Sequence, residues 1–238
     1  MKEVFFSDYL QKKGKESLAA CLAWAGIALT ILLAGIATGV VVILVSGVVV
    51  IVIALFVGAS HGRAYSTFRC GIHGEQVLRA HLLAWGLGDD YTAYYNLPLN
   101  GKGKASDIDC ILVGPSGLFV FEVKHHHGFV LYRNGIWARI KAGRMGTLYR
   151  GQLGDPSGQL YRNIRKLKEL FGRTDGLWLN GAIVFTNPRA VLDVEGLRWV
   201  KAIAVKDLGQ ILSKRTVLSA EQIEKINARL SASAKKVI

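Results

Sequence analysis

The longest feature of the hydropathy pattern is an apolar stretch near the N-terminus. No charged residue occurs from Ser17 to Ser60. A single helix of that length would be about 66 Å long, roughly twice the thickness of the hydrocarbon core of a bilayer. Two spans of about 20 residues fit better, joined by a turn near Gly35–Gly39. The pattern therefore predicts a transmembrane helical hairpin at residues 17–60.

Basic residues flank this hairpin on both sides. Lys12, Lys13 and Lys15 precede it, and Arg63 and Arg69 follow it. Because the cytoplasmic flanks of membrane helices are enriched in Lys and Arg, both ends are expected in the cytoplasm. We therefore expect a two-pass protein of the cell inner (plasma) membrane.

A cleaved signal peptide is the competing interpretation. Gly35-Ile-Ala37 resembles a small-residue cleavage site, but a second apolar span, Val40–Val57, follows it. The later domain faces the cytoplasm under either interpretation. The stretch contains no Asp, Glu, Lys, Arg or His, so we interpret it as an anchor rather than a transport pathway.

Strand and helix periodicities appear after residue 70. Two β-rich runs, 107–113 and 118–124, flank Gly114-Pro-Ser-Gly117, which is a strong hairpin signal. Other strands are predicted at 91–97 and 181–185, with a further short hairpin at 129–132 and 136–140. Helices are predicted at 72–85, at 157–171 and from Ser219, where Gln222 completes a capping box.

These elements follow the order helix, three strands, further strands, helix, strand, helix. The order predicts an α/β domain with a mixed central sheet flanked by helices. The expected segments are a cytoplasmic N-terminal segment at 1–16, the membrane hairpin at 17–60, a linker at 61–70, the α/β domain at 71–190 and a C-terminal helical extension at 191–238.

The positive charge of the chain is concentrated after the hairpin. The formal net charge is +13, of which residues 1–60, with four Lys and three acidic residues, supply +1. The remaining +12 favours a polyanionic partner, although it also suits a domain that only stays soluble beside an anionic leaflet. The three cysteines, Cys21, Cys70 and Cys110, are too widely spaced for a disulfide framework or zinc site, which fits a reducing compartment.

The hairpin around 114–117 brings acidic residues together. With a symmetric turn, Asp109 lies opposite Glu122 and Asp107 lies opposite Lys124, and all four side chains point to one face. Opposed carboxylates repel each other, and a divalent cation such as Mg²⁺ relieves the repulsion. Lys124 can stabilise charge on a phosphate or orient a water molecule. The alternative is a hydrated Asp109 at a strand end and a surface ion pair between Glu122 and Lys124.

Several motifs together resemble one known family. They are Gly71-Ile-His-Gly-Glu75, the run Asp107-Ile-Asp-Cys-Ile-Leu-Val-Gly-Pro-Ser-Gly-Leu-Phe-Val-Phe-Glu-Val-Lys124, Gly128, Trp137 and Pro156-Ser-Gly-Gln159. Over roughly residues 70–190 the chain resembles the nuclease-related domain family, NERD, which is assigned to the PD-(D/E)xK nuclease superfamily. The resemblance implies a restriction-endonuclease-like fold. Two departures are that no proline precedes Asp109 and that Asp107 has no matching role.

The resemblance implies roles for five residues. Asp109 and Glu122 look like ligands of Mg²⁺, with Mn²⁺ as the alternative ion. Lys124 looks like the catalytic lysine, and Glu75 and Gln159 look like further residues of the catalytic site. The implied activity is metal-dependent hydrolysis of nucleic acid, with DNA favoured over RNA. Each of the last two residues has an alternative role without the resemblance. Glu75 can stabilise the positive N-terminal end of a helix dipole, and Gln159 can form a hydrogen bond to a loop.

Basic residues elsewhere are candidates for binding nucleic acid. Lys102 and Lys104 flank glycines in a predicted turn, and Arg162, Arg165 and Lys166 lie on the polar side of a predicted helix. Both groups can neutralise phosphates. Both can equally form solvated polar faces.

Three classes of function remain open. A membrane-anchored nuclease comes first because the Asp, Glu and Lys set is complete. The second is a non-catalytic nucleic-acid-binding or signalling module that retains the nuclease fold, and the third is a membrane adaptor whose basic face binds anionic lipid or protein. The run His125-His126-His127 adds no metal site, since adjacent residues of a strand point in different directions; we expect a solvated strand end there.

Overall fold

The computed structural model describes residues 1–6, 9–38, 41–99, 106–143, 145–151, 153–172, 179–212 and 215–235. The chain forms two compact units. One contains Asp8–Ile72, and the other contains Met1–Ser7 and His73–Ile238. The boundary falls within a long helix, and each unit is described by itself.

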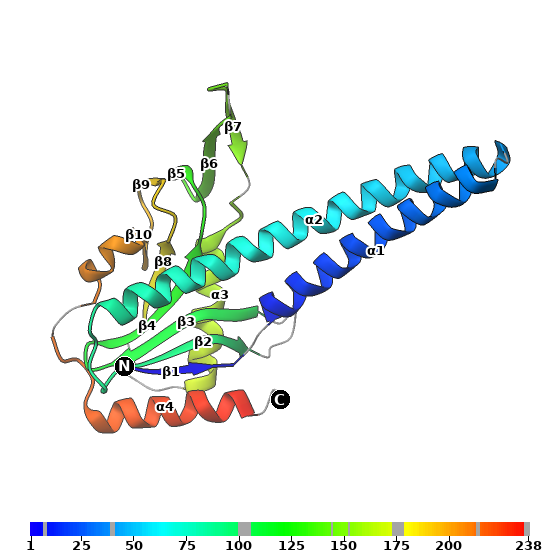
Figure 1. The fold of residues 1–238 in the computed structure, drawn as a ribbon. Coiled ribbons are helices and arrows are strands. Elements are labelled where there is room, and N and C mark those ends of the chain that lie inside the picture. Colours follow the sequence, from blue (N-terminus) through cyan, green and yellow to red (C-terminus); the bar gives the residue numbers. More distant parts are fainter. Residues whose placement is uncertain are drawn as a thin grey trace. The chain divides into compact units, whose positions relative to one another are not determined.

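The smaller unit is a pair of antiparallel helices (Figure 1). They are α1 (Tyr9–Thr38) and the first part of α2 (Val41–Ala84). A Cβ atom on Gly14, early in α1, would lie 3.7 Å from Phe68, whereas Gly58 approaches Trp24 at 3.8 Å in the same way. The start of α1 therefore packs against a later part of α2, and the middle of α1 packs against an earlier part.

Apolar side chains cover the outside of this helix pair. Leu22, Leu29, Ile36 and Phe56 are each more than half exposed. Within the described residues one helix, Gln11–Ala37, is long and apolar enough to cross a membrane, with a mean hydropathy of 2.2. The predicted apolar anchor is thus supported for its first span.

The rest of the expected hairpin is found only in part. Residues 41–57 are helical within α2, but among the described residues no second helix qualifies as a span. The expected turn is partly described, since Gly35 lies in α1 and Gly39 lies outside the described residues. Residues 61–70, expected as a linker, are part of α2 because no proline interrupts the sequence from 41 to 84.

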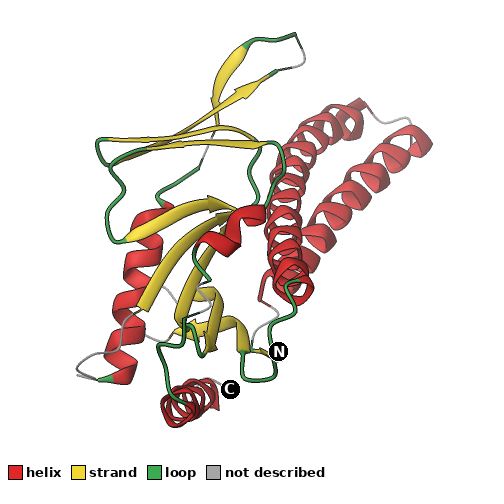
Figure 2. Cartoon of the chain, turned by 90° about the vertical axis from the view of Figure 1, so that its left-hand side faces the viewer, coloured by secondary structure: helices red, strands yellow, loops and turns green. Residues whose placement is uncertain are grey.

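The larger unit is built on a mixed sheet with the order β1-β2-β3-β4-β8-β10 (Figure 1; Figure 2). Its strands are β1 (Lys2–Phe5), β2 (Thr92–Leu99), β3 (Ser106–Gly114), β4 (Gly117–Lys124), β8 (Leu179–Phe185) and β10 (Val200–Ala204). β2, β3 and β4 pair antiparallel, while β1–β2, β4–β8 and β8–β10 are parallel. The mixed α/β fold expected from the order of elements is therefore confirmed.

Helices cover both faces of this sheet because successive side chains of its central strands are apolar on both sides. Ile111 of β3 packs in one core layer with α3 (Pro156–Phe171) and α4 (Ala220–Lys235). The next residue, Leu112, packs in the other layer with the end of α2 and the 3₁₀ helix η1 (Val205–Gln210). The sheet therefore separates two apolar layers.

A second sheet has the strand order β7-β6-β5-β9. Its strands are β5 (Gly128–Arg133), β6 (Ile136–Ala142), β7 (Leu148–Gly151) and β9 (Ala190–Val194). The predicted β5–β6 hairpin turns at Asn134 and Gly135, which both have positive φ. Residues 191–238, expected as a helical extension, instead supply most of β9, all of β10 and then α4.

β1 joins the N-terminal residues to the main sheet. It pairs in parallel with β2, and Phe5 stacks on Tyr95 with ring centroids 4.9 Å apart. Arg79 of α2 donates two hydrogen bonds to the carboxylate of Glu3, at 2.7 and 2.8 Å. The segment expected at 1–16 therefore begins as a strand of the α/β unit, and the apolar helices are inserted between β1 and β2.

Candidate active site

The β3–β4 hairpin has the predicted symmetric register. Its ladder runs from the turn to the pair Cys110–Phe121. It stops one pair before Asp109 and Glu122, whereas the β2–β3 and β4–β8 ladders continue beyond this point. The two strands therefore diverge where the two acidic residues lie.

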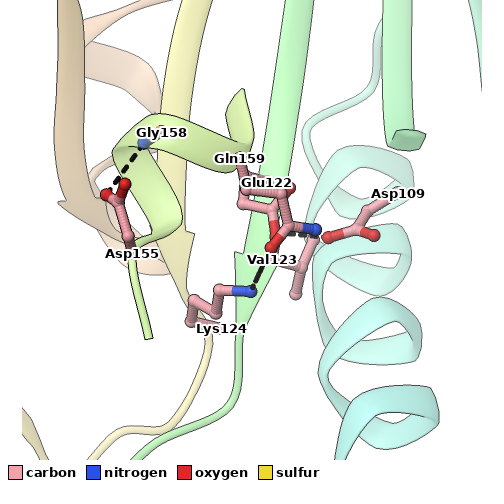
Figure 3. Close-up of polar contacts among 7 residues, drawn as sticks. All are labelled: Asp109, Glu122, Val123, Lys124, Asp155, Gly158 and Gln159. Atoms are coloured by element: carbon pink, nitrogen blue, oxygen red, sulfur yellow. Dashed lines mark hydrogen bonds and ion pairs between the residues drawn. The ribbon is translucent and has the colours of Figure 1, made fainter. Parts of the chain in front are cut away.

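The carboxylate of Asp109 lies at the point of divergence. Its Oδ2 accepts a hydrogen bond of 2.7 Å from the backbone N–H of Val123 (Figure 3). A side-chain oxygen thus bridges the two strands next to Glu122. Asp107 does not pair opposite Lys124 as the sequence predicts, because the β3–β4 ladder has already ended at Cys110 and Phe121.

Glu122 and Lys124 form a buried ion pair two residues apart on β4. The ammonium of Lys124 donates to Glu122 Oε1 at 2.7 Å and to Gln159 Oε1 at 3.3 Å. The side chain of Glu122 is 1% exposed and that of Lys124 is 18% exposed. This burial excludes the surface ion pair considered as the alternative.

The start of α3 positions Gln159. Asp155 caps the helix and accepts a hydrogen bond of 2.9 Å from the Gly158 N–H (Figure 3). It also accepts a hydrogen bond of 2.9 Å from the Ser157 hydroxyl. Ser157 in turn accepts a bond of 2.9 Å from the indole of Trp137. Gly158 has no room for a side chain, because a Cβ atom would lie 2.0 Å from Asp155 Oδ2. This capped start fixes Gln159 beside the lysine.

Glu75 reaches the site from α2. Burial raises its pKa to about 8, and the charge of Asp109 adds to this rise, while a hydrogen bond with Asn96 opposes it. Asn96 is a site residue that the sequence reasoning missed. It lies in β2 between the ladder pairs of Tyr95 and Leu97 and has a φ of +55°. Its only signal is an Asn inside a strand, where that residue is disfavoured.

Burial disfavours the ionised forms of the carboxyl groups at this site. Burial raises the pKa of Glu122 to about 8; the charge of Asp109 adds to this rise and Lys124 opposes it. Burial likewise raises the pKa of Asp109, against the charge of Lys124. Burial alone would lower the pKa of Lys124, but the charges of Glu122 and Asp109 outweigh it and raise that pKa.

The raised pKa values of Glu122 and Lys124 favour different protonation states for their contact. The raised pKa of Glu122 favours a neutral acid, whereas the raised pKa of Lys124 favours an ion pair. We take the ion pair, because a 2.7 Å contact is a short charge-assisted hydrogen bond. The raised pKa of Glu122 then reflects its burial beside a second acid, Asp109, because both carboxyl groups share the charge of Lys124.

A divalent cation fits this arrangement. Glu122 Oε2 is buried and has no hydrogen-bond partner in the described structure, and a cation shared with Asp109 would satisfy it and relieve the repulsion. The described residues contain no cluster of three or more His, Cys, Asp or Glu side chains that would hold an ion. Mg²⁺ is often held by one or two carboxylates, because water and substrate phosphate complete its shell.

The histidine run is less solvated than expected. The ring nitrogens of His125 contact Thr186 Oγ1 at 3.0 Å and Asn187 Nδ2 at 3.2 Å. His126 Nδ1 lies 2.6 Å from the guanidinium of Arg139, and burial, followed by the charge of Arg139, lowers the pKa of His126 to about 4. The expectation of a solvated strand end is therefore wrong for these two residues. They have separate partners because they point in different directions.

The predicted phosphate-binding residues are placed in part. Lys102 and Lys104 lie outside the described residues. Arg162 and Arg165 are exposed on α3, and Lys166 is half-buried there. Arg162 follows Gln159 by three residues on α3, and Gln159 contacts Lys124, so this side of α3 borders the acidic site.

Residues 71–186 match the family model described as nuclease-related domain, NERD. The range contains all five residues of the candidate site, Glu75, Asp109, Glu122, Lys124 and Gln159. A stretch of 103 residues, 42% of this chain, is 27% identical to part of a protein from Streptomyces coelicolor named "Probable kinase PglW". That stretch covers 6% of the Streptomyces protein. No solved structure matches the chain significantly. The matches support a nuclease-related function.

Proposed function

We propose that the protein is a membrane-anchored nuclease that hydrolyses the phosphodiester bonds of DNA with Mg²⁺, for which Mn²⁺ can substitute. The observation that carries the proposal is a pair of carboxylates, half-buried Asp109 and buried Glu122, beside the ammonium of Lys124. The match of residues 71–186 to the nuclease-related family supports it. The net charge of +13 suits a polyanionic substrate.

Asp109 and Glu122 are the residues that would hold the metal ion. When bound, the ion supplies a Lewis acid for the scissile phosphate and lowers the pKa of a bound water. Lys124 keeps its proton, and its ammonium stabilises the charge that develops on the phosphate. Gln159 holds this ammonium in place through their 3.3 Å contact. Glu75, with a pKa of about 8, can exchange a proton near neutral pH.

The apolar helices are proposed as a two-pass anchor in the inner (plasma) membrane. Gln11–Ala37 has the length and hydropathy of a span, and the exposed apolar side chains of the helix pair favour lipid over water. β1 and β2 pair in one sheet although the helices separate them in sequence. Both ends of the insertion therefore start from one folded unit, which favours an even number of crossings. The basic flanks support a cytoplasmic position for that unit and both termini.

The catalytic proposal is tested with the full chain in detergent, supercoiled plasmid DNA and Mg²⁺. Wild-type protein is expected to nick or degrade the DNA, and EDTA is expected to stop the reaction. Asp109→Asn, Glu122→Gln and Lys124→Met are each expected to lower the cleavage rate by about 10²-fold or more, because each removes charge stabilisation that the transition state needs. Asp193→Asn, in an exposed acid of the second sheet, is the matched control and should cleave like wild type.

DNA binding separates this function from the alternatives. In EDTA, Lys124→Met should keep most of the wild-type affinity for DNA, since it removes one cation of many. Binding of DNA without any metal-dependent cleavage by the wild type would identify a non-catalytic binding module that retains the fold. Binding of anionic vesicles in preference to DNA would identify a membrane adaptor.

A further inference from the structure

The connection between β9 and β10 presents an unusual aromatic residue. Trp199 is 82% exposed and has a φ of +68°. A bulky side chain in the left-handed region is strained, and exposure of an indole forgoes its burial. Neither property stabilises the fold, so an interaction with another molecule is the better explanation. Trp199 also lies beyond residues 71–186, the range that matches the nuclease-related family.

The neighbours of Trp199 tie this connection to α3. The hydroxyl of Tyr161 donates a hydrogen bond to the backbone oxygen of Arg198. The next residue of the chain, Val200, packs with Ile164 of α3 over Gly181, where a Cβ atom would lie 2.8 and 2.7 Å from them. The connection that carries Trp199 is therefore held against α3, the helix that also carries Gln159.

The surface around Trp199 is cationic. Exposed basic residues lie on α3 and around the start of β10: Arg162, Arg198 and Lys201. Arg165 lies 3.9 Å from Glu169, so these two charges offset each other, and Glu195 lies 3.1 Å from Arg133. Arg162 follows Gln159 by three residues on α3, so the cationic surface continues toward the acidic site.

The sheet register gives the separation between Trp199 and the site. Val200 is opposite Gly181 of β8, whereas Ala202 is opposite Ile183, which is itself opposite Glu122 of β4. Trp199 is thus two strands across and three residues along from the level of Glu122. That separation is about 14 Å.

We infer that Trp199 is a stacking platform for an unpaired base of a nucleic acid strand whose phosphates follow the cationic side of α3. An exposed indole offers a face on which any base stacks, and neighbouring arginines bind the backbone. The inference implies that the bound nucleic acid has a single-stranded segment. Its link to cleavage rests on the function proposed above, but the stacking contact does not.

The test compares three labelled ligands by fluorescence anisotropy, with the full chain in detergent and EDTA present. They are a single-stranded DNA, an abasic strand of the same length and a blunt duplex. Trp199→Ala should weaken binding of the single strand roughly 5- to 100-fold, whereas Trp199→Phe should retain most of the affinity. The abasic strand should bind both proteins equally. Phe129→Ala, which removes an aromatic of the second sheet that is 53% exposed, is the matched control and should bind like wild type.

One further variant and one further readout keep the result clear. Trp199→Gly removes both the indole and the left-handed strain, so it should fold at least as stably as wild type and bind as weakly as Trp199→Ala. Equal single-strand affinities of wild type and Trp199→Ala, or equal losses on the abasic strand, would overturn the inference. So would a loss confined to anionic vesicles, which would assign Trp199 to a lipid surface.

The two proposals fail separately. Plasmid cleavage that needs Mg²⁺, together with single-strand binding that ignores Trp199, would remove only the stacking platform. Single-strand binding that depends on Trp199, without cleavage, would remove only the nuclease.

Discussion

At the scale of single residues, the candidate site is short of positive charge. Glu75, Asp109 and Glu122 are acids with raised pKa values, and Lys124 is the cation that pairs with Glu122. A buried carboxyl that stays protonated avoids the cost of an uncompensated charge. The folded protein without metal therefore holds protons that the unfolded chain releases.

This proton excess predicts how stability depends on pH. The pKa of Glu75 is about 8 in the folded state against 4.5 ordinarily. Between those values Glu75 keeps a proton that the unfolded chain releases, so the free energy of unfolding should fall as pH rises. The fall should be on the order of 1–2 kcal/mol from pH 6.5 to pH 8, which lies above the range where the lowered pKa of His126 acts in the opposite sense. The measurement is urea unfolding in EDTA, followed by tryptophan fluorescence at several pH values.

Glu75→Gln isolates the contribution of that carboxyl. The amide cannot ionise, so the variant should show a shallower fall in stability across the same range. Glu3 is not a confounding group here, because its pKa is lowered by the hydrogen bonds and charge of Arg79 and its effect falls below pH 4.5. A variant slope as steep as that of wild type would contradict the assignment of the buried proton to Glu75.

At the scale of elements, the site depends on the close packing of α2 against the ends of β4 and β8. A Cβ atom on Gly74 would lie 2.9 Å from His125 Cβ and 3.1 Å from Thr186 Oγ1. His125 Cβ cannot rotate away, since it is fixed to the backbone. Glycine at this position therefore lets α2 approach closely enough for the adjacent Glu75 to enter the site.

Gly74→Ala should push α2 away from the sheet. We expect a loss of about 1–3 kcal/mol in the free energy of unfolding from overpacking, and a lower cleavage rate because Glu75 moves with the helix. Gly62→Ala is the control in the same helix, because its Cβ would only touch Cys21 Sγ at 3.9 Å and alanine favours a helix. A Gly74→Ala protein as stable and active as Gly62→Ala would show that close approach is not required.

The elements also show what the sequence could predict. Local signals were reliable: the turn at 114–117 has its predicted register, and Ser219 and Gln222 form the predicted reciprocal capping box. Pairing between distant segments has no local signal, so β1 and the divergence at Asp109 were missed. The acidic pair could be located because it depends on one short hairpin, whereas Asn96 depends on the irregular path of β2.

At the scale of the whole molecule, the helices are an insertion in the α/β unit. β1 precedes them and β2 follows them, yet the two strands are hydrogen-bonded neighbours. Lys2 at the start and the residues after His73 must therefore lie in the same aqueous compartment if the unit is folded. A single crossing of the membrane would separate β1 from β2 and break the Glu3–Arg79 ion pair.

Membrane topology is therefore predicted to follow from the sheet. In variants with one cysteine each, exposed positions on the two flanks, Lys12→Cys and the native Cys70, should react with an impermeant maleimide only in inverted vesicles of the plasma membrane. Gly39→Cys, at the predicted turn, should react only in right-side-out vesicles. Labelling of Lys12→Cys and Cys70 from opposite faces would mean one crossing, in which case β1 could not pair with β2 in the membrane-bound protein. Labelling of all three positions in inverted vesicles alone would mean that the helices do not cross the membrane, and the exposed apolar side chains of α1 and α2 would then need a protein partner.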